Sequence, residues 1–510
     1  MSTPAEKLAN ALEKMQTAQN EGVVRSNALS RTYLLRLTQA GFLQEIIRGW
    51  YFVTNPTIHA GSTAWYGAYW SFLSQYLTDR FGEDYCLLPE SSLRLLTGST
   101  IVPKQLAIMR RSPGQQVLPL CLDTSLFIYQ ERGNFPERIV ERNGVRVMEI
   151  SEALLRVSES FFRENPDDAV IALRILRDPT ALLSGLLENG RSVVAGRLAG
   201  ALRHIGDTST ADRIVSAMRS AGYDVRESNP FDKPIPLPFS QIRPRSPYVP
   251  RLQGMWAKMR GEVVELFPAP PNHATIVDTK TYLAQLEEKY VQDAYHSLSI
   301  EGYQVTPTLI EKVRSGLWDP DSDTSDRATT AALAARGYWE AFRLVRTCVA
   351  DIISGAEAIP IVKQSHHEWH RALFAPSVQA GLLTPATLAG YRQGPVFIRG
   401  SRHVPLPAHA LADAMDTLFE ILAQEEHPAA RAVLGHFLFV FVHPYFDGNG
   451  RLGRFLMNVM FASGGYPWTI VHLENRLRYM EALEEASVNQ NIRPFATCIL
   501  DEMNSDGHGS

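Results

Sequence analysis

The sequence predicts a mainly helical protein made of several domains. Its 510 residues are 45% apolar, which is enough material for large cores, and the length alone suggests about three domains. Helix-compatible stretches recur in the C-terminal half, for example from Thr281 to Ser297, whereas short β-like runs lie mostly in the first half. We therefore expect a C-terminal core of packed helices with one β-hairpin, preceded by a half of mixed α and β structure.

The first 56 residues have the outline of a winged helix-turn-helix. Residues 5–20 are typical of a helix, and Ser30 is placed to cap a second helix over residues 31–40, which Gly41 ends. Two short β-like runs, 42–47 and 50–54, flank Arg48-Gly49. Helix, helix and tight hairpin follow one another in this motif. Six Lys/Arg against four Glu give residues 1–56 a net charge of +2, which is only a faint basic bias.

This segment resembles the N-terminal winged helix of abortive-infection (AbiEi-like) antitoxins and regulators. The similarity rests on Ser30-Arg31, Leu34, Gly41, Leu43 and Arg48-Gly49-x-Tyr51. Residues 57–229, which include Pro89 to Leu93 and Gly196 to Leu202, are similar to the mixed α/β domain that follows in those proteins. If the wing binds DNA, we expect the contacts from Arg31, Thr32, Arg36 and Arg48. A winged helix used only for protein contacts is the alternative.

A change of composition marks the main domain boundary. Seven prolines lie between Pro230 and Pro250 among polar residues, which is typical of an extended, semi-rigid linker. We assign residues 230–275 to this linker and its lead-in, and residues 276–505 to the helical core. The end of the chain, Asn504 to Ser510 with residues 506–510 as its tail, is expected to be disordered.

The run from His443 to Arg454, HPYFDGNGRLGR, predicts a nucleotide-phosphate site. Gly448 and Gly450 are expected to take positive φ, so that successive N–H groups converge on an anion. From Arg451 onward the sequence is helix-compatible, which would place the anion at the positive end of a helix dipole. The residues expected to act there are His443 as base, Asp447 as Mg²⁺ ligand, and Arg451 and Arg454 as phosphate-binding forks.

This run resembles the signature of the Fic (filamentation induced by cAMP) family, HxFx[D/E]GNGRxxR, with Tyr445 where the family usually has Phe. The resemblance implies a protein adenylyltransferase that transfers AMP from ATP, with Mg²⁺, to a Ser, Thr or Tyr hydroxyl. By the same resemblance, Asn449 and the loop amides of Gly448 and Gly450 would anchor the α-phosphate. We expect the Tyr445 ring to pack in the core and its hydroxyl to find a partner.

A second motif, Ser297-x-x-x-Glu301-Gly302, ends the predicted helix that precedes the core. On its own it is typical of a helix terminus with Gly302 as the residue that follows the C-cap. Next to the loop described above it is similar to the family's inhibitory motif, [S/T]xxxE[G/N]. That resemblance implies that Glu301 pairs with Arg454 and takes the place of the γ-phosphate, so that the resting enzyme is inhibited in cis.

The stretch from Tyr391 to Pro405 predicts a hairpin with a turn at Gly400-Ser401. It is similar to the Fic flap, in which Val396, Phe397 and Ile398 would position the target by strand addition. An ordinary surface hairpin is the alternative.

Family resemblance also places Asn475 and Tyr479 near the nucleoside. At helical spacing these two residues could equally be a helix cap and a core aromatic.

The histidine-rich run His366-His367-Glu368-Trp369-His370 suggests a zinc site, but the HExxH pattern fails because Arg371 stands where its second histidine would be. A helix packed beside the core is the preferred interpretation.

Composition limits the cellular setting and the partners. The apolar runs are too short to span a membrane, the first residues lack the apolar region of a signal peptide, and four scattered cysteines form no CxxC pair. We therefore expect a cytoplasmic protein with no membrane partner. The net charge of −4 argues against nucleic acid as partner of the whole molecule, which leaves DNA contact to residues 1–56. A homodimer is suggested by analogy only.

Two functions of different classes remain after the sequence has been considered. The first is an autoinhibited protein adenylyltransferase. The second is a DNA-binding transcriptional regulator or toxin–antitoxin-like protein that uses the Fic fold as a nucleotide sensor. A complete set of catalytic residues favours the first, because a sensor has no need of His443. Removal of AMP, or transfer of another nucleotidyl or phosphoryl group, stays open within the enzyme class.

Overall fold

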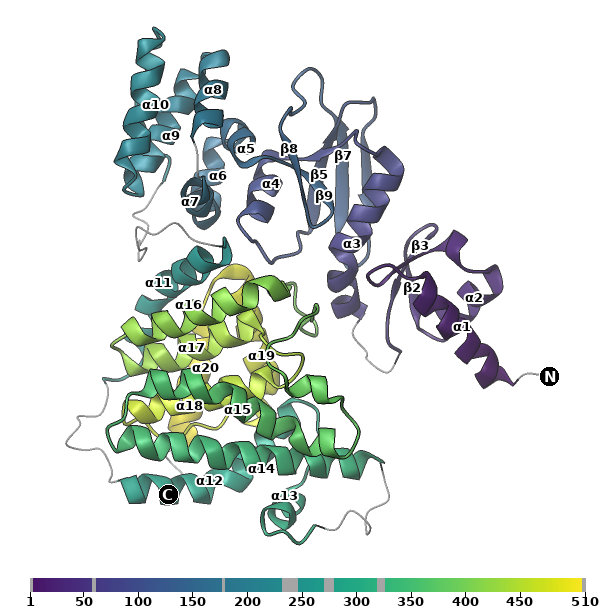
Figure 1. Cartoon of the computed structure of the whole chain (residues 1–510), viewed down its shortest axis with the longest axis vertical. Coiled ribbons are helices and arrows are strands. Elements are labelled where there is room, and N and C mark those ends of the chain that lie inside the picture. Colours follow the sequence, from purple (N-terminus) through teal and green to yellow (C-terminus); the bar gives the residue numbers. More distant parts are fainter. Residues whose placement is uncertain are drawn as a thin grey trace. The chain divides into compact units, whose positions relative to one another are not determined.

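The computed structural model describes residues 3–56, 61–176, 179–231, 246–269, 279–318 and 326–506 (Figure 1). The chain divides into two compact units. Unit 1 consists of Met1–Arg251 together with Val396–Val404, and unit 2 consists of Leu252–Pro395 together with Pro405–Ser510. Within the described ranges, helices predominate and the sheets are small, as the sequence predicted. None of the described helices is long and apolar enough to cross a membrane.

The N-terminal part of unit 1 has the predicted helices and hairpin, with ends that agree within about two residues. Ser30 accepts a hydrogen bond from the Tyr33 amide and so caps the second helix, and Gly41 after it has φ +76°. One strand, β1, was not predicted; it pairs with β3, which gives the sheet order β1-β3-β2. The elements are α1 (Pro4–Ala18), β1 (Val23–Arg25), α2 (Arg31–Gln39), β2 (Leu43–Ile47) and β3 (Trp50–Val53).

The rest of unit 1 is mixed α and β, as predicted for residues 57–229. A four-stranded sheet has the order β4-β5-β7-β6, with β5 and β7 parallel, and β8 and β9 form a hairpin. Neighbouring residues of β5 face two different cores. Ile108 packs in the core that includes α3 (Gly61–Phe81), whereas Met109 packs in the core that includes the helices from α5 (Ile150–Arg156) onward. The strands are β4 (Cys86–Leu87), β5 (Gln105–Arg110), β6 (Gln116–Pro119), β7 (Ser125–Gln130), β8 (Ile139–Arg142) and β9 (Val145–Met148).

Eight helices accompany these strands in the described part of unit 1. The motif from Pro89 to Leu93 opens α4, and the motif from Gly196 to Leu202 lies inside α9. Gly196 and Gly200 let the chain at Arg226 and Ser228 approach α9, because a Cβ on either glycine would lie about 2 Å from a carbonyl oxygen. The helices are α3 (Gly61–Phe81), α4 (Pro89–Leu96), α5 (Ile150–Arg156), α6 (Glu159–Glu164), α7 (Pro166–Ile175), α8 (Thr180–Glu188), α9 (Ser192–His204) and α10 (Thr208–Ser220).

The hairpin predicted between Tyr391 and Pro405 is not formed, and this prediction was wrong. The turn lies one residue early, where the Ser401 amide donates to the carbonyl of Ile398 over 3.1 Å, and neither arm is a strand. Instead, Val396–Val404 belongs to unit 1, where His403 bridges to Ile101. Backbone groups that would have paired across the hairpin bond to another segment, which turn chemistry alone cannot foresee.

Unit 2 is the predicted core of packed helices. Its centre is the pair α17 and α18, whose residues are almost all buried, and α14 lies along α15 (Figure 1). The helices are α11 (Tyr248–Leu266), α12 (Thr279–Ile300), α13 (Pro307–Arg314), α14 (Asp326–Ile353), α15 (Ala358–Gln379), α16 (Leu411–Gln424), α17 (Pro428–Val442), α18 (Asn449–Ser463), α19 (Arg476–Asn489) and α20 (Arg493–Asp506).

Two boundary predictions need correction. Much of the predicted linker, 232–245 and 270–278, lies outside the described residues, but α11 occupies 248–266. This helix packs because Trp256 and Arg260 both donate to the buried Glu425 carboxylate, a tertiary contact invisible in the local composition. At the other end, α20 continues to Asp506, so residues 504–506 are helical rather than disordered. Residues 507–510 lie outside the described residues.

Candidate active site

The loop from His443 to Gly448 joins the two central helices of unit 2. It begins where α17 ends, with His443 in the left-handed region at φ +54°, and it ends at Gly448, with φ +87°, directly before α18. Asn449 holds the loop closed, because its side-chain oxygen accepts from the Tyr445 amide at 3.0 Å and its nitrogen donates to the Tyr445 carbonyl at 2.8 Å. The side chain predicted to bind the α-phosphate therefore fixes the backbone of Tyr445 within the loop through both its oxygen and its nitrogen.

Gly450 does not take the positive φ that was predicted for it. It lies in the first turn of α18, which begins two residues earlier than expected, at Asn449. Its lack of a side chain has a different consequence: a Cβ at this position would lie 2.3 Å from the Glu301 carboxylate oxygen. Gly450 therefore makes room for an anionic group at the N-terminus of α18, where the helix dipole favours negative charge.

His443 has the protonation state of a base. Its Nδ1 lies 3.1 Å from the carbonyl oxygen of Val440, to which it donates, so that the neutral ring carries its lone pair on Nε2. Burial lowers the pKa of the imidazole to about 4. The ring is therefore neutral at pH 7 and has a nitrogen that can accept a proton from a hydroxyl group.

Arg451 is a buried cation with unused donors. Its side chain lies over the rings of Tyr303 and Phe374, with the guanidinium carbon 5.2 and 4.9 Å from the two centroids. Its Nη2 is 3.3 Å from an Asp447 oxygen. In the part of the chain that the structure describes, neither Nε nor Nη2 of Arg451 has a hydrogen-bond partner, although both atoms are buried. Unsatisfied buried N–H groups of an arginine are costly unless an anion completes them.

Arg454 is held by the predicted inhibitory motif. Its Nε donates to the Ser297 hydroxyl at 3.0 Å, and its Nη2 donates to the Ser297 carbonyl at 3.0 Å and to Glu301 at 2.8 Å. Gly302, with φ +93°, ends this segment just after α12. The remaining Nη1 of Arg454 is buried and unpartnered among the described residues. The sequence motif and the loop thus meet, with the carboxylate placed between Arg454 and Gly450.

Asp447 is the predicted Mg²⁺ ligand. Its side chain is 58% exposed and accepts from the Gly448 amide at 2.6 Å, beside Arg451. No group of three or more His, Cys, Asp or Glu in the described ranges could hold a metal by itself. One exposed carboxylate beside the Arg451 guanidinium fits a Mg²⁺ ion that takes its other ligands from phosphate and water. The residues present therefore fit a Mg²⁺ ion only when a polyphosphate is bound as well.

The histidines of α15 pack behind the loop. The run from His366 to His370 is thus part of a helix beside the core, which was the preferred interpretation of its sequence. The Tyr445 ring stacks on His370 with centroids 3.9 Å apart, and its hydroxyl lies 2.8 Å from Nδ1 of His367. His366 lies 2.8 Å from the Tyr391 hydroxyl. Burial lowers the pKa of His366 to about 3 and that of His370 to about 4. These rings are neutral packing partners of the loop, and the extra hydroxyl of Tyr445 has the partner expected for it.

Asn475 and Tyr479, which family resemblance placed near the nucleoside, both bond to other side chains of the helical core. Asn475 precedes α19, and its side chain donates to Glu502 at 3.0 Å. Tyr479 is 1% exposed, and its hydroxyl lies 2.7 Å from Nε2 of the buried His436. For Tyr479 this environment favours the alternative of a core aromatic.

The residues predicted to contact DNA lie in the first domain of unit 1. Arg31, Thr32 and Arg48 are exposed, whereas Arg36 is partly buried and donates to the Lys7 carbonyl at 3.1 Å. Three of the four are thus available on the surface, and Arg36 connects α2 to α1.

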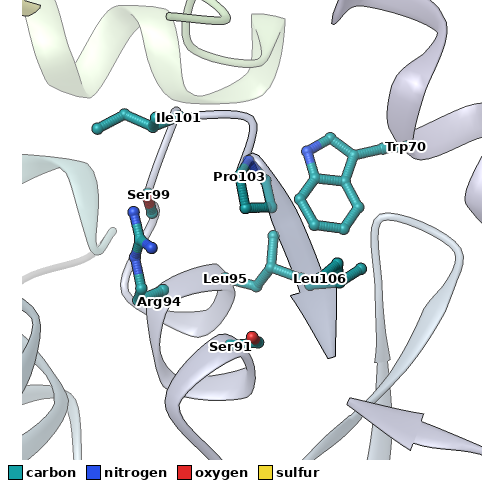
Figure 2. A pocket seen from close by; sticks show the side chains of 8 residues that line it. All are labelled: Trp70, Ser91, Arg94, Leu95, Ser99, Ile101, Pro103 and Leu106. Atoms are coloured by element: carbon teal, nitrogen blue, oxygen red, sulfur yellow. The ribbon is translucent and has the colours of Figure 1, made fainter. Parts of the chain in front are cut away.

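A pocket of about 290 Å³, a volume that includes space open to solvent, lies elsewhere in unit 1 (Figure 2). Its lining is largely apolar and contains none of the predicted site residues: Trp70, Ser91, Arg94, Leu95, Ser99, Ile101, Pro103 and Leu106.

Comparison with known proteins agrees with this geometry. Residues 362–461, which contain α18 and the loop before it, match the model of the Fic/DOC family. The chain contains a Fic domain. Proteins described as "Protein adenylyltransferase Fic" are similar to it: that of Nematostella vectensis is 30% identical over 215 residues, which are 41% of this chain and 46% of the relative. That of Aedes aegypti is 27% identical over 233 residues, 45% of this chain and 43% of the relative.

These matches are partial. The chain spans less than half the length of either curated relative. Among solved structures, "Fic-1 (aa134 - 508) from C. elegans" is 18% identical and covers 66% of this chain and 94% of its own, with a TM-score of 0.36.

Sequence reasoning missed three contributors to the Fic site. Tyr303 and Phe374 enclose Arg451, although neither belongs to a motif. Arg392 is 2% exposed, and its Nε donates to the His443 carbonyl at 2.8 Å. Arg392 lies near the start of the stretch predicted as a hairpin, where nothing in the local sequence distinguishes it from a solvent-exposed arginine.

Proposed function

We propose that this protein is an autoinhibited adenylyltransferase that transfers AMP from ATP to a hydroxyl group of a target protein. The observation that carries the proposal is a set of buried N–H groups on Arg451 and Arg454, at the N-terminus of α18, that have no hydrogen-bond acceptor among the described residues. They call for a multiply charged anion with several acceptor oxygens, as in a polyphosphate. The names of the curated relatives support the same activity.

His443 supplies the base for this reaction. The target hydroxyl oxygen attacks the α-phosphorus of ATP, the bond from that phosphorus to the oxygen that bridges to the β-phosphate breaks, and pyrophosphate leaves. The hydroxyl proton moves to Nε2 of His443, because Nδ1 is occupied by the Val440 carbonyl. The neutral state of the ring at pH 7 makes it ready for this role.

The arginines and the helix terminus stabilise charge on the leaving group. Arg451 and Arg454 would hold the β- and γ-phosphates with the donors now free, while the first N–H groups of α18 face the α-phosphate. Mg²⁺ held by Asp447 and phosphate oxygens would offset further negative charge on the pyrophosphate. The protein thus contributes position and electrostatics rather than a covalent intermediate.

Glu301 is the inhibitory element of the proposal. Its carboxylate lies 2.8 Å from Arg454 Nη2 and against Gly450, where the terminal phosphate of a productively bound ATP would lie. Arg454 is 4% exposed, so breaking this pair leaves a buried cation until phosphate replaces the carboxylate. Glu301 and the γ-phosphate therefore compete for one guanidinium.

The proposal is tested with α-labelled ATP, Mg²⁺ and a cell lysate, by comparing four proteins. These are the wild type, Glu301→Gly, Glu301→Gly with His443→Ala, and Glu288→Gln as a matched control on the exposed face of α12. We expect label on protein only with Glu301→Gly, and its loss when His443 is replaced. If Glu301→Gly transfers no label while it still binds ATP, the proposed reaction is wrong.

DNA binding by residues 1–56 is a second candidate function. It is favoured by the exposure of Arg31 and Thr32 in the first turn of α2 and of Arg48 between β2 and β3. A gel shift on DNA from upstream of the protein's own coding sequence tests it. Loss of the shifted band with Arg31→Ala plus Arg48→Ala supports the assignment, and an unchanged band counts against it.

A further inference from the structure

We propose that Arg392 is a positioning residue that fixes His443 for proton transfer, with a guanidinium that also binds the backbone carbonyls of Gly394 and Leu406. The proposal rests on the adenylyltransferase function proposed above, and it concerns residues of unit 2 only. Arg392 lies in the stretch predicted as a hairpin, but it was not among the residues predicted to act in the site.

The guanidinium of Arg392 uses all three of its nitrogens on backbone carbonyls. Nε donates to His443 at 2.8 Å, Nη1 to Gly394 at 2.8 Å and Nη2 to Leu406 at 2.5 Å. The backbone amide of Arg392 adds a bond to the Pro444 carbonyl at 2.9 Å. One side chain therefore connects the end of α17 with the two residues that flank the segment 395–405.

Burying the guanidinium of Arg392 costs free energy. Burial lowers the pKa of Arg392 to about 10, and its guanidinium forms no ion pair with any residue in the part of the chain that the structure describes. A buried cation without a counter-ion is costly, although the negative end of the α17 dipole and three carbonyls compensate for part of this cost. An apolar side chain could fill the same space, but it could not hold three carbonyls in one plane, which the guanidinium fork does.

The hydrogen bond from Arg392 restrains the backbone of His443, and this backbone determines where the Nε2 atom lies. His443 is a non-glycine residue at φ +54°, a conformation that persists only when its surroundings enforce it. Arg392 restrains the carbonyl side of this residue, and Val440 restrains its ring. If Arg392 is removed, the backbone can relax and Nε2 moves away from the line between the target hydroxyl and the α-phosphorus. A displacement of about 1 Å in such a geometry lowers the rate about 100-fold.

The test uses the full chain with Glu301→Gly and adds Arg392→Met or Arg392→Lys. Arg431→Met is the control, because Arg431 is partly buried and, like Arg392, donates to a backbone carbonyl, in this case that of Glu425. It lies on α17 twelve residues before His443, hence about 18 Å away along the helix. Four quantities are measured: the melting temperature, the Kd for ATP, the kcat for label transfer, and the rate at which diethylpyrocarbonate modifies His443 relative to the exposed His409.

We expect kcat to fall about 100-fold with Arg392→Met and less with Arg392→Lys, while the Kd for ATP changes less than about threefold. His443 should be modified faster in both variants, and Arg431→Met should change neither quantity even if it melts earlier. Unchanged kcat in folded Arg392→Met protein overturns the proposal, and so does a loss of ATP binding in step with kcat. The chemical modification needs no turnover: if Glu301→Gly itself transfers no label, the proposed function fails, whereas an unchanged His443 modification rate refutes the positioning role.

Discussion

The contact between Glu301 and Arg454 predicts a measurable strength of inhibition. Replacing the carboxylate with an amide, Glu301→Gln, keeps the size of the side chain and removes the charge that competes with phosphate. The pair consists of one hydrogen bond of 2.8 Å between a guanidinium that is 5% exposed and a carboxylate that is 23% exposed. A hydrogen bond between charged groups contributes about 1.5–3 kcal/mol, and partial exposure of Glu301 places this pair toward the lower end.

That free energy sets the fraction of protein in which the γ-phosphate can displace Glu301. A difference of about 1.5–3 kcal/mol corresponds to a factor of about 10 to 150 in this fraction. At saturating ATP, transfer of label should therefore be about 10 to 150 times faster with Glu301→Gln than in the wild type. Glu301→Asp keeps the charge but shortens the reach, so its rate should lie between the two.

The assay is the initial rate of label transfer at several ATP concentrations, with Glu288→Gln as the control on α12. The Kd for ATP is measured in parallel. If Glu301→Gln transfers AMP within twofold of the wild-type rate while it binds ATP normally, the carboxylate does not compete with the γ-phosphate. The competition argument would then be wrong even if the enzyme is an adenylyltransferase.

Three further predictions follow from the site and its surroundings. Because burial lowers the pKa of His443 to about 4, kcat/KM of Glu301→Gly should be flat from pH 8 to 6 and fall only as pH drops toward 4; a midpoint near 6.5 contradicts this. Tyr445→Phe should lower the free energy of unfolding by about 0.5–1.5 kcal/mol, measured in urea, with little change of kcat, since only the bond to His367 is lost. His436 is fully buried, and burial lowers its pKa to about 3. Below pH 6.5 the unfolded state therefore binds a proton at this histidine that the folded state does not bind, so the free energy of unfolding declines as the pH falls. From pH 6.5 to 5 this histidine alone should lower the free energy of unfolding by about 2 kcal/mol, and His436→Gln should show a smaller decline than the wild type; equal declines would contradict the assignment.

The sequence determined those parts of the protein in which local chemistry is sufficient. An acidic residue, a glycine directly before a helix start and two arginines three residues apart predicted a phosphate site at the start of α18, because Asp447 to Arg454 lie close together in the chain. The helices and hairpin of the first domain followed for the same reason, from caps and turn residues such as Ser30 and Gly41. The winged-helix resemblance and its DNA contacts stay predictions.

Tertiary structure decided everything that depends on residues far apart in the chain. Gly450 was expected to bend the loop, but it is helical and leaves space for Glu301, about 150 residues earlier. The predicted hairpin was lost because His403 bonds to a segment about 300 residues away. Arg392 shows the limit most clearly: its role arises from three carbonyls that only folding brings together, and no local pattern distinguishes it from a solvated arginine. Backbone groups and buried charges take whichever partners the whole fold supplies, so their roles are fixed by packing rather than by sequence spacing.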